Sequence, residues 1–222
     1  MVQASLTAAP IGRPVVLADM LGGTRARDAA LVAGGVLLTA LLAQVSLPVP
    51  GSPVPITGHT LAVVLVAAGL GPARGVAAQV AYIGAALIGF PFYAEATGGY
   101  QVVFSASGGY VFGFVPAAYL IGLAARHGAD RNTLRALPLF LLGQAVIFAV
   151  GIPWLAVTAG LNAEQALEAG LYPFILGGVV KAAVAAVLLP AAWRTVRHYT
   201  DGESPAGRPV SPAERPTTRE KP

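Results

Sequence analysis

The sequence predicts an all-α membrane protein with six transmembrane helices and both termini in the cytoplasm. Three observations lead to this fold class: the composition, the lengths of the apolar runs and the positions of the basic residues. Hydrophobic residues make up 55% of the 222 residues and charged residues only 11%, with a mean hydropathy of +0.69. Soluble domains carry about 25% charged residues, so lipid must cover most of this surface.

The apolar runs divide into six segments of membrane-crossing size. A bilayer core about 30 Å thick requires roughly 20 apolar residues per helix, and fewer where neighbouring helices shelter the span. Gly71 and Pro72 separate the short second run from the third, because proline disrupts a helix interior. The predicted spans are 29–47, 58–71, 73–90, 108–125, 136–160 and 173–192.

The flanking segments differ from this single membrane domain, which we place at residues 29–192. Residues 1–28 are predicted to form a cytoplasmic N-terminal segment, since the first long apolar run begins near Ala29 and is a full span rather than a signal peptide. Residues 193–222 are polar and proline-rich. Such a composition cannot bury a core, which predicts a disordered cytoplasmic tail.

The basic residues test the span count independently. All of the 14 Lys and Arg residues except Lys181 lie before span one, at the junction of spans two and three (Arg74), between spans four and five, or after span six. The other connections, 48–57, 91–107 and 161–172, contain none. The positive-inside rule therefore assigns both termini to the cytoplasm. The pI of 9.7 reflects this topology, because a nucleic-acid-binding protein would show a basic stripe with interleaved aromatic residues.

Lys181 lies inside the sixth span, about 12 Å along the helix from Pro173. A lysine at that depth is costly and indicates a functional site. The structural alternatives are that it reaches back to the interface or pairs with a carboxylate. No Asp or Glu lies within any predicted span, so an anionic substrate is the natural partner.

Several kinds of chemistry are missing from the sequence. There is no cysteine and no G-x-x-x-x-G-K-[ST] motif, which argues against thiol catalysis and against ATP binding by this chain. Ser107 has no histidine in the middle of a span to activate it. His59, at the outer start of span two, is either a structural residue or a substrate contact. We therefore expect no enzyme activity, no metal and no cofactor.

The outer connections combine rigidity with aromatic and small polar groups. Residues 48–57 are proline-rich and extended. Residues 91–109 contain Gly pairs together with aromatic and polar side chains, namely Phe92, Tyr93, Thr97, Tyr100, Gln101, Phe104, Ser105 and Ser107. This mixture suits a mobile lid over a small amphipathic ligand. The alternative is an ordinary interfacial aromatic belt.

The first span carries small residues at helical spacing. Ala26, Ala30 and Gly34 follow one line, and Ala29 and Ala33 lie beside it. Small residues every four positions allow another helix to approach closely. That helix could belong to this chain or to another protein.

Five motifs follow one another in residues 29–192: PVPITGHTL (53–61), GPARG (71–75), AYIGAALIGFPFYA (81–94), SGGYVFGF (107–114) and YPFILGGVVKAAVAA (172–186). In this order and combination they resemble the BioY family, the biotin-binding S components of energy-coupling factor (ECF) transporters.

The resemblance implies high-affinity biotin capture and uptake at the cell membrane, by six helices with outer loops forming a lid. It also implies association with a transmembrane coupling subunit and two ATPase subunits, with biotin as substrate rather than cofactor. The matching small residues on the first helix are Ala29, Ala30, Ala33 and Gly34. Alternatives are an S component for another small anionic vitamin, or a stand-alone facilitator that transports without the ATPases.

The resemblance also assigns candidate substrate contacts. Lys181 matches the family's lysine in span six and is expected to contact the biotin carboxylate. Tyr82, Phe92 and Tyr100 are candidates for the apolar wall of the site. The candidates for polar contacts are Thr57, His59, Gln101 and Ser107. One departure is Gly178, where the family usually has an Asp three residues before the lysine.

Overall fold

A computed structural model describes residues 15–21 and 24–202, with side chains up to Val196. Five long helices dominate it: α1 (Arg25–Ala43), α2 (His59–Leu87), α4 (Gly108–Arg126), α5 (Thr133–Ala159) and α7 (Tyr172–Gly202). All five are long and apolar enough to cross a membrane. The shorter elements are η1 (Leu17–Leu21), β1 (Ser46–Leu47), β2 (Ile56–Thr57), η2 (Ala94–Ala96), α3 (Tyr100–Val103), η3 (Ala129–Arg131) and α6 (Ala163–Gly170).

Helix α2 is a hairpin of two antiparallel halves. Gly71 has a φ of 80° and a ψ of 178°, a conformation that favours glycine, and Pro72 starts the second half. His59 and Tyr82 are 23 residues apart, yet their side chains are joined by a hydrogen bond of 2.6 Å. A continuous helix would separate them by about 35 Å. The two halves are the predicted second and third spans, so the chain crosses the membrane six times, as predicted.

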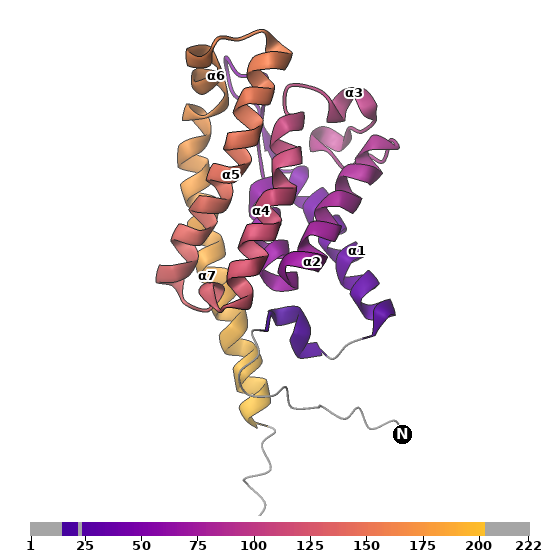
Figure 1. Cartoon of the computed structure of the whole chain (residues 1–222), viewed down its shortest axis with the longest axis vertical. Coiled ribbons are helices and arrows are strands. Elements are labelled where there is room, and N and C mark those ends of the chain that lie inside the picture. Colours follow the sequence, from indigo (N-terminus) through magenta and orange to yellow (C-terminus); the bar gives the residue numbers. More distant parts are fainter. Residues whose placement is uncertain (1–14, 22–23, 203–222) are drawn as a thin grey trace, which may run out of the picture.

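The helices form a bundle, and the contacts between them show which helices are neighbours. Helix α4 packs between α2 and α5, α1 packs on α2, and α7 packs on α5 and α2. Figure 1 shows α1 and the α5–α7 pair on opposite sides of α4. Close packing depends on glycine where α4 meets the α2 turn, because a Cβ on Gly122 would lie 2.5 Å from the Pro72 nitrogen.

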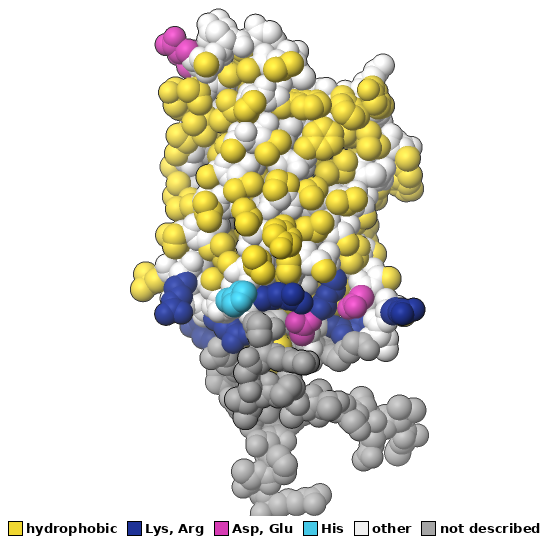
Figure 2. Space-filling view, in the orientation of Figure 1, with side chains coloured by type: hydrophobic (Ala, Val, Ile, Leu, Met, Phe, Trp, Pro, Cys, Tyr) yellow, Lys and Arg dark blue, Asp and Glu magenta, His cyan; other side chains and the backbone are white. Residues whose placement is uncertain are grey.

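The charged side chains separate along the bundle. In Figure 2 the Lys and Arg side chains visible at the surface gather at one end of a broad apolar belt. That end contains the start of α1, the α2 turn, the α4–α5 connection and the last part of α7. The positive-inside rule identifies it as the cytoplasmic end. The opposite end, with the β1–β2 pair, η2, α3 and α6, is the outer face.

The N-terminal segment packs against the bundle in its described part. Val16 and Ala18 are buried beneath α2, and a Cβ on Gly71 would lie 3.3 Å from the Val16 side chain. Arg74 is paired with Asp19 and lies 3.5 Å from Asp28. Helix α1 also begins four residues before the predicted span, because Thr24 caps it by accepting a hydrogen bond from the Arg27 amide.

The predicted boundary of the C-terminal tail at residue 193 is wrong. Helix α7 continues to Gly202, and Trp193 is buried, with its Nε1 donating to Asp130 Oδ2 at 2.7 Å. Arg131 lies over the same indole ring, 4.5 Å from its centroid. The prediction started the tail too early because it was based on a count of apolar residues, which gives no information on these side-chain contacts. Residues 203–222, the rest of the predicted tail, lie outside the described residues.

Candidate ligand-binding site

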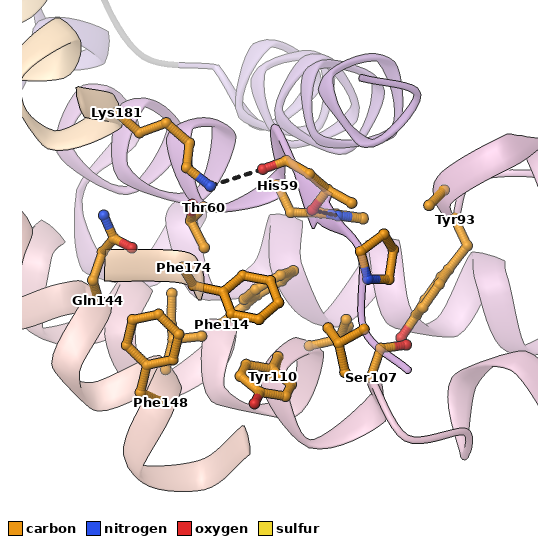
Figure 3. Close-up of a pocket in the computed structure, with 16 residues that line it drawn as sticks. His59, Thr60, Tyr93, Ser107, Tyr110, Phe114, Gln144, Phe148, Phe174 and Lys181 are labelled. Carbon is orange, nitrogen blue, oxygen red and sulfur yellow. Dashed lines mark hydrogen bonds between the residues drawn. The ribbon is translucent and has the colours of Figure 1, made fainter. Parts of the chain in front are cut away.

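A cavity opens toward the outer face between α2, α4, α5, α7 and the outer connections. The space between these elements, open solvent at the mouth included, is about 590 Å³. Val54, Pro55, Tyr93 and Ala94 line it from the outer connections. Figure 3 shows side chains from well-separated parts of the chain converging on this space.

Aromatic rings from three helices form one wall of the cavity. Tyr110 of α4 lies 6.1 Å from Phe148 of α5 and 6.4 Å from Phe174 of α7, measured between ring centroids. The Tyr110 hydroxyl donates to the carbonyl of Gly170 at 2.9 Å, outside the cavity, so the residue presents its ring. Phe114 adds a fourth ring, 5.6 Å from that of His59. Such a wall accepts the apolar part of a ligand.

Lys181 brings a cation to the cavity from the outer third of α7. Its Nζ donates to the Thr57 carbonyl at 2.8 Å, which leaves further ammonium hydrogens for a ligand. Both ion pairs found among the described residues belong to Arg74, so no described carboxylate neutralises this lysine. A partly buried cation without a described protein anion favours an anionic ligand group.

Gln144 of α5 lies beside Lys181 on the same side of the cavity (Figure 3). Its Nε2 donates to the carbonyl of Gly178 at 2.5 Å. If the Gln144 amide were flipped, its Oε1 would face the Gly178 carbonyl oxygen, and two acceptors would meet. The hydrogen bond therefore fixes the orientation of the amide. The second N–H and the amide oxygen remain available to a ligand. The hydroxyl of Thr60, nearby in Figure 3, has no hydrogen-bond partner among the described residues.

His59 is held by the protein through both ring nitrogens. The Tyr82 hydroxyl donates its single hydrogen to the Phe92 carbonyl at 3.0 Å, so Nε2 of His59 must donate to the Tyr82 oxygen at 2.6 Å. The neutral ring then accepts from the Thr57 hydroxyl at Nδ1, at 2.7 Å. This chain of hydrogen bonds ties the start of α2 to the outer connection at Phe92. His59 therefore lines the cavity with its ring rather than with a free polar atom.

Tyr93 and Ser107 lie across the cavity from Lys181 and Gln144 (Figure 3). The Ser107 hydroxyl is 3.1 Å from that of Ser105. The Tyr93 hydroxyl is buried and has no hydrogen-bond partner among the described residues. Burial raises the pKa of the Tyr93 phenol, so the hydroxyl keeps its hydrogen and can donate it. The cavity thus has polar groups at two ends and aromatic rings between them.

The predicted substrate contacts divide into two groups. Thr57, His59, Ser107 and Lys181 line the cavity. Tyr82 is fully buried behind His59. Phe92 packs on Phe90 at 5.3 Å, and Tyr100 and Gln101 are exposed. The structure does not bring these last three side chains to the cavity.

Sequence reasoning missed most of the aromatic wall and two polar groups. The aromatic and polar lining residues that were not among the predicted contacts are Thr60, Tyr93, Tyr110, Phe114, Gln144, Phe148 and Phe174. Tyr93 had been named only as part of the outer connection. Tyr110 and Phe114 lie within the SGGYVFGF motif, and Phe174 within YPFILGG, so the motifs pointed to their segments. Gln144 is the only amide in the predicted fifth span, and that isolation was a usable signal.

The small-residue stripe of α1 lies on the surface of the bundle. Ala29, Ala30, Ala33 and Gly34 are exposed, and a Cβ on Gly34 would meet nothing within 4 Å. Gly35, one residue on, faces inward, where its Cβ would lie 3.0 Å from Ala78 and Val66. The described helices of this chain therefore leave the stripe uncovered.

Six membrane crossings around a cavity that opens outward define a multi-pass membrane protein with a small-molecule pocket. Comparison with known proteins identifies the family within this class. The chain belongs to the BioY family, whose family model matches residues 14–198.

Curated relatives and a solved structure agree with this assignment. A probable biotin transporter BioY of Pyrococcus horikoshii is 34% identical over 74% of this chain and 94% of its own length. The biotin transporter BioY of Rhizobium etli is 33% identical over 73% of this chain and 90% of its own. The crystal structure of an S-component for biotin from an ECF-type ABC transporter has the same fold, with a TM-score of 0.69 and 24% identity, covering 78% of this chain and 95% of that one.

Proposed function

We propose that this protein captures biotin from outside the cell as the S component of an ECF-type importer. The relatives are named as biotin transporters rather than as enzymes, and the structural neighbour is described as an S-component for biotin. The observation that carries the proposal is Lys181, a cation that no described carboxylate neutralises, in an outward-opening cavity with an aromatic wall.

The chemistry of biotin matches the arrangement of the cavity. Biotin has a carboxylate, an apolar chain, and a fused ring system with a ureido group. Lys181 provides the charge for the carboxylate, with the free N–H of Gln144 and the hydroxyl of Thr60 beside it. The rings of Tyr110, Phe148 and Phe174 suit the apolar chain and the thioether ring. The ureido group then faces the hydroxyls at the outer end.

Import against a gradient requires an energy source outside this chain, which has no phosphate-binding motif. We propose that a transmembrane coupling subunit docks on the exposed α1 stripe, defined by Ala29, Ala30, Ala33 and Gly34, and connects it to two ATPase subunits. Small exposed residues at helical spacing are the surface that a partner helix needs for close approach.

The direct test is a binding titration of the purified protein in detergent. We expect saturable biotin binding that lipoate, pantothenate and niacin do not displace at equal concentration. Displacement of biotin by one of these would identify another vitamin as the substrate. Uptake by the protein in vesicles, with and without the coupling and ATPase subunits, tests the partners. Equal ATP-independent uptake in both cases would identify a facilitator instead.

A further inference from the structure

Tyr93 has a buried hydroxyl that makes no hydrogen bond with the described residues. The residue is 3% exposed, it is one of those that line the cavity, and its hydroxyl has no partner among the described residues. A buried donor without an acceptor is unfavourable, and native structures contain few of them. A ligand in the cavity would supply the missing acceptor.

The Tyr93 ring is fixed in place before any ligand arrives. It stacks on the Tyr82 ring, with centroids 6.2 Å apart and planes 13° apart, and meets the edge of His59 at 5.8 Å. Tyr82 is a contrasting case, because both hydrogen-bonding roles of its hydroxyl are taken by His59 and Phe92. Of these two stacked tyrosines, only Tyr93 has a hydroxyl left for a ligand.

The backbone that carries Tyr93 is strained and is held by α1. Glu95 and Ala96 have φ angles of 58° and 53°, two successive non-glycine residues in the left-handed region. Such strain persists where the surroundings hold it, and it concentrates at ligand clamps. Gln44, at the end of α1, provides the hold. Its Nε2 donates to the Tyr93 carbonyl at 3.0 Å, and its Oε1 accepts from the Ala96 amide at 2.9 Å.

We infer that the Tyr93 hydroxyl donates a hydrogen bond to the ureido oxygen of bound biotin, and that Gln44 is the positioning residue that holds Tyr93 over the ligand. This inference rests on the proposed function and deepens it, because it assigns the outer end of the cavity to the ureido group. It also ties the ligand, through Gln44, to the helix that carries the exposed small-residue stripe.

The first experiment removes only the hydroxyl. Tyr93→Phe keeps the ring and its stacking, and we expect biotin to bind about tenfold more weakly to the purified protein in detergent. The matched control is Tyr119→Phe on α4, which removes a hydroxyl from a side chain that is 52% exposed and should leave affinity unchanged. The wild type should also prefer biotin over 2-iminobiotin, which lacks the ureido oxygen, and Tyr93→Phe should reduce that preference.

The outcomes separate the inference from the proposed function. Biotin binding by the wild type with unchanged affinity in Tyr93→Phe would overturn the role of Tyr93 and leave the function standing. A reduced affinity with an unchanged preference over 2-iminobiotin would overturn the ureido contact. No binding of biotin by the folded wild type would contradict the proposed function itself.

The second experiment tests Gln44 as a positioning residue. Gln44→Leu removes both hydrogen bonds to the strained loop, so we expect biotin to dissociate several-fold faster. Because Gln44 acts through Tyr93, the double variant with Tyr93→Phe should bind no more weakly than Tyr93→Phe alone. Fully additive losses in the double variant would show that Gln44 acts by another route and would overturn this part of the inference.

Discussion

At the scale of single residues, the hydrogen bonds that a polar side chain already makes within the protein decide whether it is free to contact a ligand. His59 uses both ring nitrogens on Thr57 and Tyr82, whereas Lys181 gives one hydrogen to a backbone carbonyl. Both are polar groups in apolar segments, and the sequence assigned both to the ligand. The structure makes Lys181 the better candidate for direct recognition and His59 the residue that anchors the outer connection.

Gly178 offers a sharp test of the Gln144 contact. A Cβ at position 178 would lie 2.8 Å from Oε1 of Gln144, so Gly178→Ala must displace the amide from its carbonyl partner. We expect biotin affinity to fall several-fold. Stability should change little, because the lost hydrogen bond, about 1 kcal/mol, offsets the similar gain in helix propensity.

The neighbouring glycine is the matched control for this substitution. A Cβ at Gly177 would meet only Ile56, at an ordinary 3.7 Å. Gly177→Ala should therefore raise the melting temperature in detergent and leave biotin affinity unchanged. Equal affinity in the two variants would show that the Gln144 amide has no part in binding.

The limits of the sequence are clearest for side-chain direction. Aromatic residues in the outer connection predicted a ligand wall, but Phe92 and Tyr93 are adjacent and only Tyr93 reaches the cavity. An irregular segment has no periodicity from which its inward face can be read. Gln144 was missed for another reason. Its amide lies against Gly178 of another helix, in space that is open because glycine has no side chain, and a contact between two helices cannot be read from either segment alone. The family's usual Asp is absent at position 178, and an amide from α5 occupies the adjoining space.

At the scale of elements, the spans were predictable because membrane length and charge placement constrain them directly. The α2 hairpin illustrates this, since Gly71 and Pro72 marked its turn correctly. Element ends were less predictable because they depend on side-chain contacts. Thr24 extends the start of α1, and Trp193 carries α7 beyond the apolar run.

The exposed stripe on α1 yields a prediction about assembly. Ala33→Leu or Gly34→Leu adds bulk to a surface that is exposed in the described bundle, with open space around Gly34, so biotin binding should persist. Close approach by a partner helix should be blocked, and ATP-dependent uptake and co-purification with the coupling subunit should fall. Gly84→Leu, at another exposed helical glycine with open space around it, is the control. If uptake falls equally in the control, the stripe is not the docking surface.

At the scale of the whole molecule, a buried contact at the cytoplasmic end joins the last helix to the α4–α5 connection. Asp130 accepts the Trp193 N–H, and Arg131 covers the indole ring and donates to the Val15 carbonyl at 2.9 Å. Burial raises the pKa of the Asp130 carboxyl, opposed by the Trp193 hydrogen bond and by the Arg131 charge.

This raised pKa predicts a pH dependence of stability. A carboxyl with a raised pKa in the folded state binds its proton more tightly when folded. Its contribution to stability therefore falls as the pH rises from the unfolded pKa, about 4, through the higher folded value. Asp130→Asn keeps an acceptor oxygen for Trp193 and cannot ionise, so its melting temperature relative to wild type should rise between pH 4 and 7. A relative fall over that window would contradict the sign of the shift.

The most direct test of the central claim, that this cavity binds biotin through Lys181, compares biotin with biotin methyl ester in the wild type and in Lys181→Met. Methionine keeps a long apolar side chain and removes the charge. The wild type should prefer the acid, and Lys181→Met should bind the acid about ten- to a hundredfold more weakly, the cost of losing a charge-assisted hydrogen bond of about 1.5–3 kcal/mol. The preference for acid over ester should largely disappear in the variant. An equal preference for the acid in both proteins would show that Lys181 does not recognise the carboxylate.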